Sequence, residues 1–154
     1  MTEMQSITRA ALLRELNDRQ IDTFRLDRDD YAPVPWGQLR RAVMTADGAV
    51  VLGFRQLHVT LGEWRPGTSE ARTPAAWYPT PWTQIEAGMA VMAEVPVLVV
   101  ADAEVSDGVF APDVWGGRVF GLPAGADETA RREVLDAWAA AVSARVLRRT
   151  GDGD

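Results

Sequence analysis

The chain has 154 residues, with 16 Lys and Arg against 22 Asp and Glu, one His and no Cys. This length is typical of one domain, and the absence of Cys excludes disulfides, a thiolate nucleophile and a zinc–thiolate site. One His excludes a multi-His metal cluster, and a net charge of −6 argues against a face that binds nucleic acid. No apolar run approaches the ~20 residues of a membrane span, and the N-terminal residues show no signal pattern. We therefore expect a soluble, cytoplasmic protein with no membrane partner.

Hydrophobic periodicity and turn residues predict the elements. In chain order they are a helix over 6–17, a strand over 21–26, a loop over 27–35, a helix over 36–46, a strand over 49–54, a short strand or half-hairpin over 56–61, a helix over 80–94, a strand over 96–100, an edge strand over 118–121 and a helix over 127–149.

Three local signals support these boundaries. Ser6 or Thr8 is expected to cap the first helix, and Pro81 suits the first position of the third, where its missing N–H would be unpaired in any case. In the first strand, Phe24 and Leu26 are expected to face inward. The apolar runs 49–54 and 96–100 are typical of strands that are covered on both faces.

The alternation of apolar strands with helices predicts an α/β fold, a parallel sheet with helices on both faces. We expect a single domain over residues 1–150 and a disordered polar tail over 151–154. Doubly wound domains usually begin with a strand, yet no apolar run precedes the first helix. The first strand is therefore missing or truncated, because the chain lacks it or because the true start lies upstream.

Ligands of open parallel sheets bind at the carboxyl ends of the strands. The segments after Leu26, Phe54 and Val100 lie at such ends. The N-terminus of the helix that follows Thr80 is expected to point into the same crevice, where its free N–H groups favour an anion such as phosphate.

The helix over residues 80–94 carries the most informative residues. Trp82 and Glu86 are four apart and share one face, and an apolar face beside them is expected from Ile85, Gly88, Met89 and Met92. Glu86 then lies at the edge of a buried stripe, where a partly desolvated carboxylate suits acid–base or nucleophilic work. Gly88 suggests a close approach by another segment. The alternative is a structural Glu that is hydrogen-bonded to a neighbouring strand.

Residues 80–90 (TPWTQIEAGMA), followed by PVLVV (96–100) and SDGVF (106–110), resemble two related families. One is the TIR domain, whose NAD-cleaving members carry Trp-Cys-x-x-Glu on this helix. The other is the nucleoside 2-deoxyribosyltransferase-like group, with a Glu-x-Gly-x-Ala helix and a following strand. The segment ADGAVVLGF (46–54) also resembles the strand before the site in the second group, so the resemblance covers about residues 39–110.

The resemblance implies a flavodoxin-like, doubly wound α/β fold and chemistry at an N-glycosidic bond. Glu86 matches the catalytic glutamate and Trp82 the motif tryptophan, whereas Thr83 stands where the TIR motif has Cys. The expected substrate-binding residues lie on the same helix and at the end of the strand before it: Trp82, Phe54, Arg55, Gly53 and Met89. Phe54 or Trp82 would stack on a base and Arg55 would pair with a phosphate; the alternatives are core packing and a solvated cation.

The remaining polar and aromatic features carry weaker expectations. His58 is expected to be structural or on the surface, and the charged loop over 27–30 to be solvated, with no metal site. Asp107-Gly108 and Trp115-Gly116-Gly117 are typical of turns. The loop tryptophans (Trp64, Trp77 and Trp115) are expected to cover the crevice or to form a subunit contact.

Together these expectations predict an enzyme that cleaves the N-glycosidic bond of NAD or a nucleoside monophosphate through Glu86. The nucleotide is the substrate, and no further cofactor is expected. The alternative is a non-catalytic module of the same fold that senses a nucleotide or mediates assembly. A homodimer is expected in either case, because an exposed sheet edge is prone to pairing.

Overall fold

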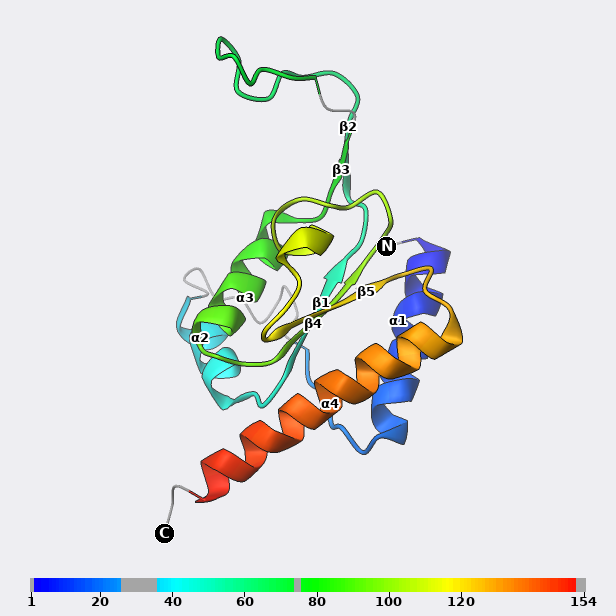
Figure 1. Cartoon of the computed structure of the whole chain (residues 1–154), viewed down its shortest axis with the longest axis vertical. Helices are drawn as coiled ribbons and strands as arrows, with labels where there is room; N and C mark the ends of the chain where they lie inside the picture. The colour runs from blue at the N-terminus through cyan, green and yellow to red at the C-terminus, as the bar shows by residue number, and fades with distance from the viewer. Residues whose placement is uncertain (1, 26–35, 74–75, 152–154) are drawn as a thin grey trace.

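The computed structural model describes residues 2–25, 36–73 and 76–151 (Figure 1). The elements in chain order are α1 (Glu3–Asp18), α2 (Trp36–Thr45), β1 (Ala49–Gly53), β2 (Leu57–Val59), β3 (Ala76–Tyr78), α3 (Pro81–Met92), β4 (Val97–Ala101), the short 3-10 turns η2 (Gly108–Phe110) and η3 (Pro112–Val114), β5 (Val119–Pro123) and α4 (Glu128–Gly151).

The sheet has three strands in the order β1-β4-β5, and both pairings are parallel. Val97 at the start of β4 lies between Ala49 of β1 and Val119 of β5, so the three strands begin in register. Helices flank both faces of this sheet (Figure 1). The expected α/β class is therefore confirmed, and the architecture is consistent with a flavodoxin-like fold built on a small sheet.

Strand β4 explains why the molecule has two hydrophobic cores. All five of its residues are buried, and successive side chains of a strand point to opposite faces. Val97, Val99 and Ala101 join the core beneath α3, whereas Leu98 and Val100 join the core beneath α1 and α4. Because apolar side chains occupy every position of β4, both faces can be covered by helices or loops.

The expected strand over residues 21–26 is wrong for its described part. Residues 21–25 form no strand, and Phe24 is 65% exposed instead of facing inward. Only Ile21 packs against the core beneath α1 and α4. The alternation of side chains over so short a segment is too weak to predict a strand, because a strand forms only where a neighbouring strand pairs with it, and no described strand does so here. Leu26 and the charged loop over 27–35 lie outside the described residues.

The cap of α1 also differs from the expectation of Ser6 or Thr8. Thr2 is the N-cap: its hydroxyl accepts a hydrogen bond from the Gln5 amide at 3.3 Å, and the Gln5 side chain accepts one from the Thr2 amide at 2.9 Å. This reciprocal arrangement is a capping box. The helix therefore begins at Glu3, one turn earlier than the apolar periodicity indicated.

An antiparallel pair of short strands projects from the body of the molecule. Strands β2 and β3 form the base of this arm, which we define as residues 57–73 and 76–78. Figure 1 shows the arm pointing away from the helices at the end where the parallel strands finish. Every residue from Thr60 to Thr73 is exposed, so the described part of the distal arm has no core of its own.

Within the described residues, no helix combines the length and the apolar character needed to cross a membrane.

Candidate functional site

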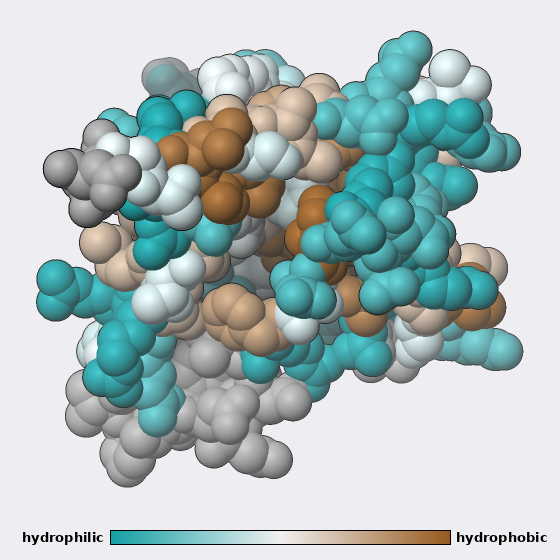
Figure 2. Space-filling model, turned by 90° about the horizontal axis from the view of Figure 1, so that it is seen from below, coloured by the Kyte–Doolittle hydropathy of each residue, from teal (hydrophilic) through white to brown (hydrophobic). Residues whose placement is uncertain are grey.

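A cleft of about 940 Å³ lies along the outer edge of β1. On its inner side β1 pairs with β4, and no described residue pairs with its other edge. Hydrophobic side chains from α1, α2, β1 and α4 supply most of the wall: Leu12, Leu13, Leu16, Leu39, Val43, Val50, Leu52, Trp138, Val142, Val146 and Leu147. Seen from the end where the parallel strands begin, the surface is hollowed and hydrophobic residues flank the hollow (Figure 2).

Glu86 is one of the residues that line this cleft. It lies on the second turn of α3, is half-buried, and lines the cleft together with Ala90. The helix begins at Pro81 with Thr80 as N-cap, as the sequence predicted. Ala87 and Ala90 are its fully buried residues, so Glu86 lies at the border between the packed face and the cleft.

The apolar face expected on α3 is not the face that packs. Ile85 is 38% and Met92 83% exposed, and a Cβ on Gly88 would meet no atom within 4 Å. The buried positions carry alanines because the helix lies close to β1 and β4, where larger side chains would not fit. Thus no described segment approaches Gly88, and the close contact occurs at Ala87 and Ala90.

Trp82 lies one turn before Glu86, as its spacing predicted. Its ring contacts that of Trp36 on α2, with centroids 5.5 Å apart and planes tilted by 41°. This aromatic pair joins α2 to α3. Trp82 is not among the described residues that line the cleft, and neither is the half-buried Met89.

Gly53 and Phe54 lie at the carboxyl end of β1 and are not among the described residues that line the cleft. Phe54 is only 6% exposed and belongs to the core, so its ring is not presented to a base. A Cβ on Gly53 would lie 2.5 Å from the Phe110 ring. A glycine is required there because the aromatic ring packs directly on the backbone.

Arg55 is engaged by acidic side chains from the loop after β4. Its amide donates to Asp102 Oδ2 at 3.0 Å, and its guanidinium contacts Asp102 at 3.5 Å and Glu104 at 3.0 Å. The guanidinium also lies 5.5 Å from the centre of the Trp77 ring. Two carboxylates thus already balance the charge that we expected to hold a phosphate.

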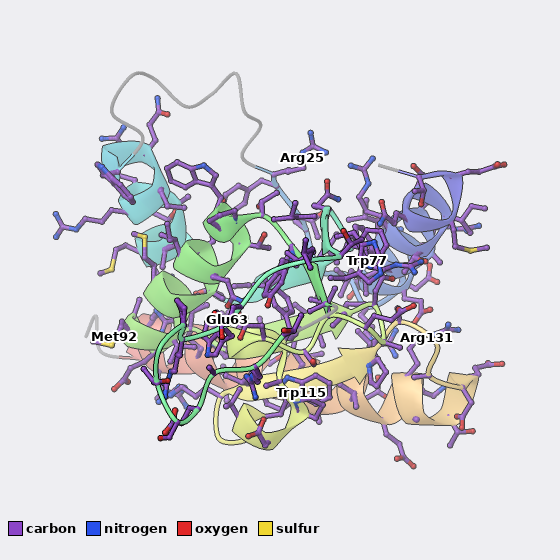
Figure 3. All side chains as sticks on the ribbon, turned by 90° about the horizontal axis from the view of Figure 1, so that it is seen from above. Arg25, Glu63, Trp77, Met92, Trp115 and Arg131 are labelled. Carbon is purple, nitrogen blue, oxygen red and sulfur yellow. The ribbon has the colours of Figure 1, made fainter. Side chains whose placement is uncertain are left out.

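Trp77 connects this cluster to the arm. It stacks on His58 with ring centroids 4.2 Å apart and planes 10° from parallel, and His58 is exposed, in line with the expected structural or surface position. Figure 3 shows Trp77 near the sheet, where the arm begins, and Arg25 on the opposite side of the sheet from Trp115. Arg55, Trp77 and the acidic loop after β4 thus contact one another near the carboxyl end of β1.

Three arginines that the sequence did not single out line the cleft: Arg9, Arg19 and Arg25. Arg19 pairs with Asp136 at 2.8 Å. The Nε atom of Arg9 is buried without a hydrogen-bond partner, and no ion pair of Arg9 is found within the described residues. The spacing of Arg9, Leu12 and Leu16 on one helical face could have indicated this position.

No family model, curated protein or solved structure matches this chain. In the described part of the chain, no group of three or more His, Asp or Glu side chains is arranged to hold a metal ion.

Gln84 holds the loop between β4 and β5 and was also missed by the sequence reasoning. Its Nε2 donates to the Asp107 carbonyl at 2.7 Å, and its Oε1 accepts from the Val109 amide at 3.1 Å. Gly108 between them has φ +61°, and a Cβ there would lie 2.5 Å from the Gln84 side chain. The turn expected at Asp107-Gly108 is thus fixed by a contact with α3.

Proposed function

We propose that this protein cleaves the N-glycosidic bond of a nucleotide, NAD or a nucleoside monophosphate, with Glu86 as the essential carboxylate. The observation that carries the proposal is the position of Glu86: half-buried and facing a cleft of about 940 Å³. That volume lies within the range of about 300–1,000 Å³ that is typical of small-molecule sites. The resemblance of residues 80–90 to the TIR and deoxyribosyltransferase-like motifs supports the same reaction.

The chemistry suits a carboxylate at the edge of an apolar wall. In hydrolysis the base leaves with the electron pair of the C1′–N bond, and water adds its oxygen to C1′, through a state with positive charge on the ribose. The water loses a proton, which goes to the departing nucleobase or, when neutral nicotinamide leaves, to solvent. Glu86 would stabilise that charge electrostatically or form a ribosyl ester that water then hydrolyses. The surrounding apolar residues exclude water and strengthen the interaction.

Arg9 is the better phosphate ligand in this proposal. Arg55, which the sequence favoured, is occupied by Asp102 and Glu104. Arg9 lines the same cleft as Glu86, and its Nε has no hydrogen-bond partner. A guanidinium that is not balanced by a carboxylate gains most from an anionic ligand.

The test is turnover. Purified protein is incubated with NAD and, separately, with nucleoside monophosphates, and the released nicotinamide or nucleobase is measured by chromatography. We expect product in molar excess over protein. Glu86→Gln should lower the rate at least 100-fold with little change in melting temperature, because it removes the charge and keeps the shape. Glu94→Gln, an exposed position just after α3, is the matched control and should keep full activity.

A nucleotide sensor is the second candidate, and the largely apolar wall of the cleft favours it, because binding needs no reactive group. A sensor would raise its melting temperature with nucleotide and release no base. If no base is released and no nucleotide shifts the melting curve, both functions are wrong.

A homodimer is part of the proposal. The outer edge of β1 has no partner strand among the described residues, and such an edge pairs readily with another chain. Sedimentation velocity at micromolar concentration should show a dimer; a monomer would contradict it.

A further inference from the structure

Two surfaces of this chain, the distal arm and the cleft along β1, expose apolar side chains. The distal arm carries exposed apolar side chains that nothing in the described structure covers: Leu61 is 87% and Trp64 43% exposed. The cleft along β1 has an apolar wall and a strand edge without a described partner. An isolated two-stranded hairpin is at best marginally stable in water, so the arm gains stability if it packs on another surface.

The arm cannot fill the cleft of its own molecule as the structure stands. It leaves the body at the carboxyl end of the sheet and points away from the helices (Figure 1). The cleft, in contrast, runs along the side of β1 and includes residues at the start of that strand, Gly48 and Ala49. A second copy has no such restriction, and two copies related by a two-fold axis would make the same contact twice.

Charge favours a second copy as the occupant. The distal arm carries Glu63, Arg65, Glu70 and Arg72 and is neutral, with Arg65 paired to Glu70. The charged residues that line the cleft also carry no net charge: Arg9, Arg19 and Arg25 against Asp22, Asp47 and Glu86. The whole chain has a net charge of −6, so two copies repel each other elsewhere, and these neutral surfaces are where they can approach.

We propose that the arm of one copy docks in the β1-edge cleft of a second copy, with Leu61 and Trp64 against the apolar wall. This inference rests on the proposed homodimer and names its contact surfaces. The arm would occupy the same cleft as the proposed nucleotide, so the two would compete for it.

A complementation experiment tests the contact. Leu61→Asp removes the apolar side chain from the arm, and Leu147→Arg places a charge in the cleft wall; both positions are exposed, at 87% and 71%, so neither change disturbs the core. We expect the dimer dissociation constant of each variant alone, measured by sedimentation, to be at least tenfold higher than that of the parent protein. A one-to-one mixture should recover a dimer, because each mixed pair keeps one intact arm and one intact cleft.

Met92→Arg is the matched control, since Met92 is 83% exposed and does not line the cleft; it should leave the dimer unchanged. If the parent is a dimer but Leu61→Asp dissociates no more readily, the homodimer stands and the arm contact is wrong. The arm-to-cleft contact is also wrong if both variants are monomers and their mixture stays monomeric. A monomeric parent protein would overturn both the homodimer and this inference.

Discussion

The two edges of the parallel sheet differ in what lies beside them. At the β5 edge, where no described strand pairs with β5 either, residues 108–118 fold back on the chain: Gly116 pairs with Val119 in a tight antiparallel bridge, and the Trp115 ring packs directly on Gly121, against the core beneath α3. At the β1 edge, the helices of both layers border a cleft. A sheet edge that is covered locally contributes to stability, whereas an edge that the described chain leaves open is available for a ligand or a partner.

The largest expected effect on stability lies at the covered edge. Trp115→Ala removes a ring that packs against the core beneath α3, and it removes the indole hydrogen bond to the Val109 carbonyl, 3.1 Å long. We expect a loss of about 3 kcal/mol in the free energy of unfolding. Urea denaturation measures it; a loss below about 1 kcal/mol would mean that Trp115 does not hold residues 108–118 against the sheet.

The covered edge could be predicted from the sequence, and the reason is local. Trp115-Gly116-Gly117 reads as a turn with an aromatic anchor, and Gly116 (φ 147°) and Gly117 (φ 61°) adopt the positive φ values that glycine allows. Strand β4 could likewise be predicted from the sequence, because a strand that is buried on both faces requires an unbroken apolar run. These signals depend on a few neighbouring residues.

The open edge could not be predicted because its geometry depends on contacts distant in sequence. The apolar spacing on α3 indicated a helix, but it did not show that Ala87 and Ala90 would face the sheet while Ile85 stays exposed. Similarly, no local pattern tells that Arg55 meets Asp102 and Glu104, since these residues are about 50 positions apart. The candidate carboxylate, Glu86, was found from its motif, but its arginine neighbours in the cleft were not.

A second prediction concerns how the covered edge is tied to α3. Gln84→Ala removes both hydrogen bonds to the loop at Asp107 and Val109, each with a net value of about 1 kcal/mol. We expect a loss of about 1–2 kcal/mol and faster hydrogen exchange at the Val109 amide. Gln56→Ala is the control: the Gln56 side chain is exposed and has no described hydrogen bond. Unchanged exchange at Val109 would show that Gln84 does not hold the loop.

A third prediction separates the arginine of the open edge from that of the carboxyl end. If Arg9 holds the phosphate, Arg9→Ala should weaken the binding of a nucleoside monophosphate about tenfold, or about 1.4 kcal/mol, and hardly affect the unphosphorylated nucleoside. Arg55→Ala should have a smaller effect on both, because Asp102 and Glu104 already neutralise Arg55. Calorimetric titration measures the affinity of both ligands for the parent and for each variant. A larger effect of Arg55→Ala would indicate that the phosphate binds at the carboxyl end of the sheet.

The smallest expected effect tests whether the β1 edge is open in the isolated chain. Phe24 lines the cleft and is 65% exposed. Burial of a side chain, and not its size, determines the cost of its truncation, so Phe24→Ala should change the free energy of unfolding by less than about 0.5 kcal/mol. This contrasts with the cost of about 3 kcal/mol expected for the aromatic-to-Ala change at Trp115.

Measuring both variants by urea denaturation at low protein concentration, where a dimer dissociates, compares the two edges directly. A cost at Phe24 close to that at Trp115 would show that the open edge is packed as tightly as the covered one. In that case the cleft would have little room for a nucleotide or for the arm of a second copy.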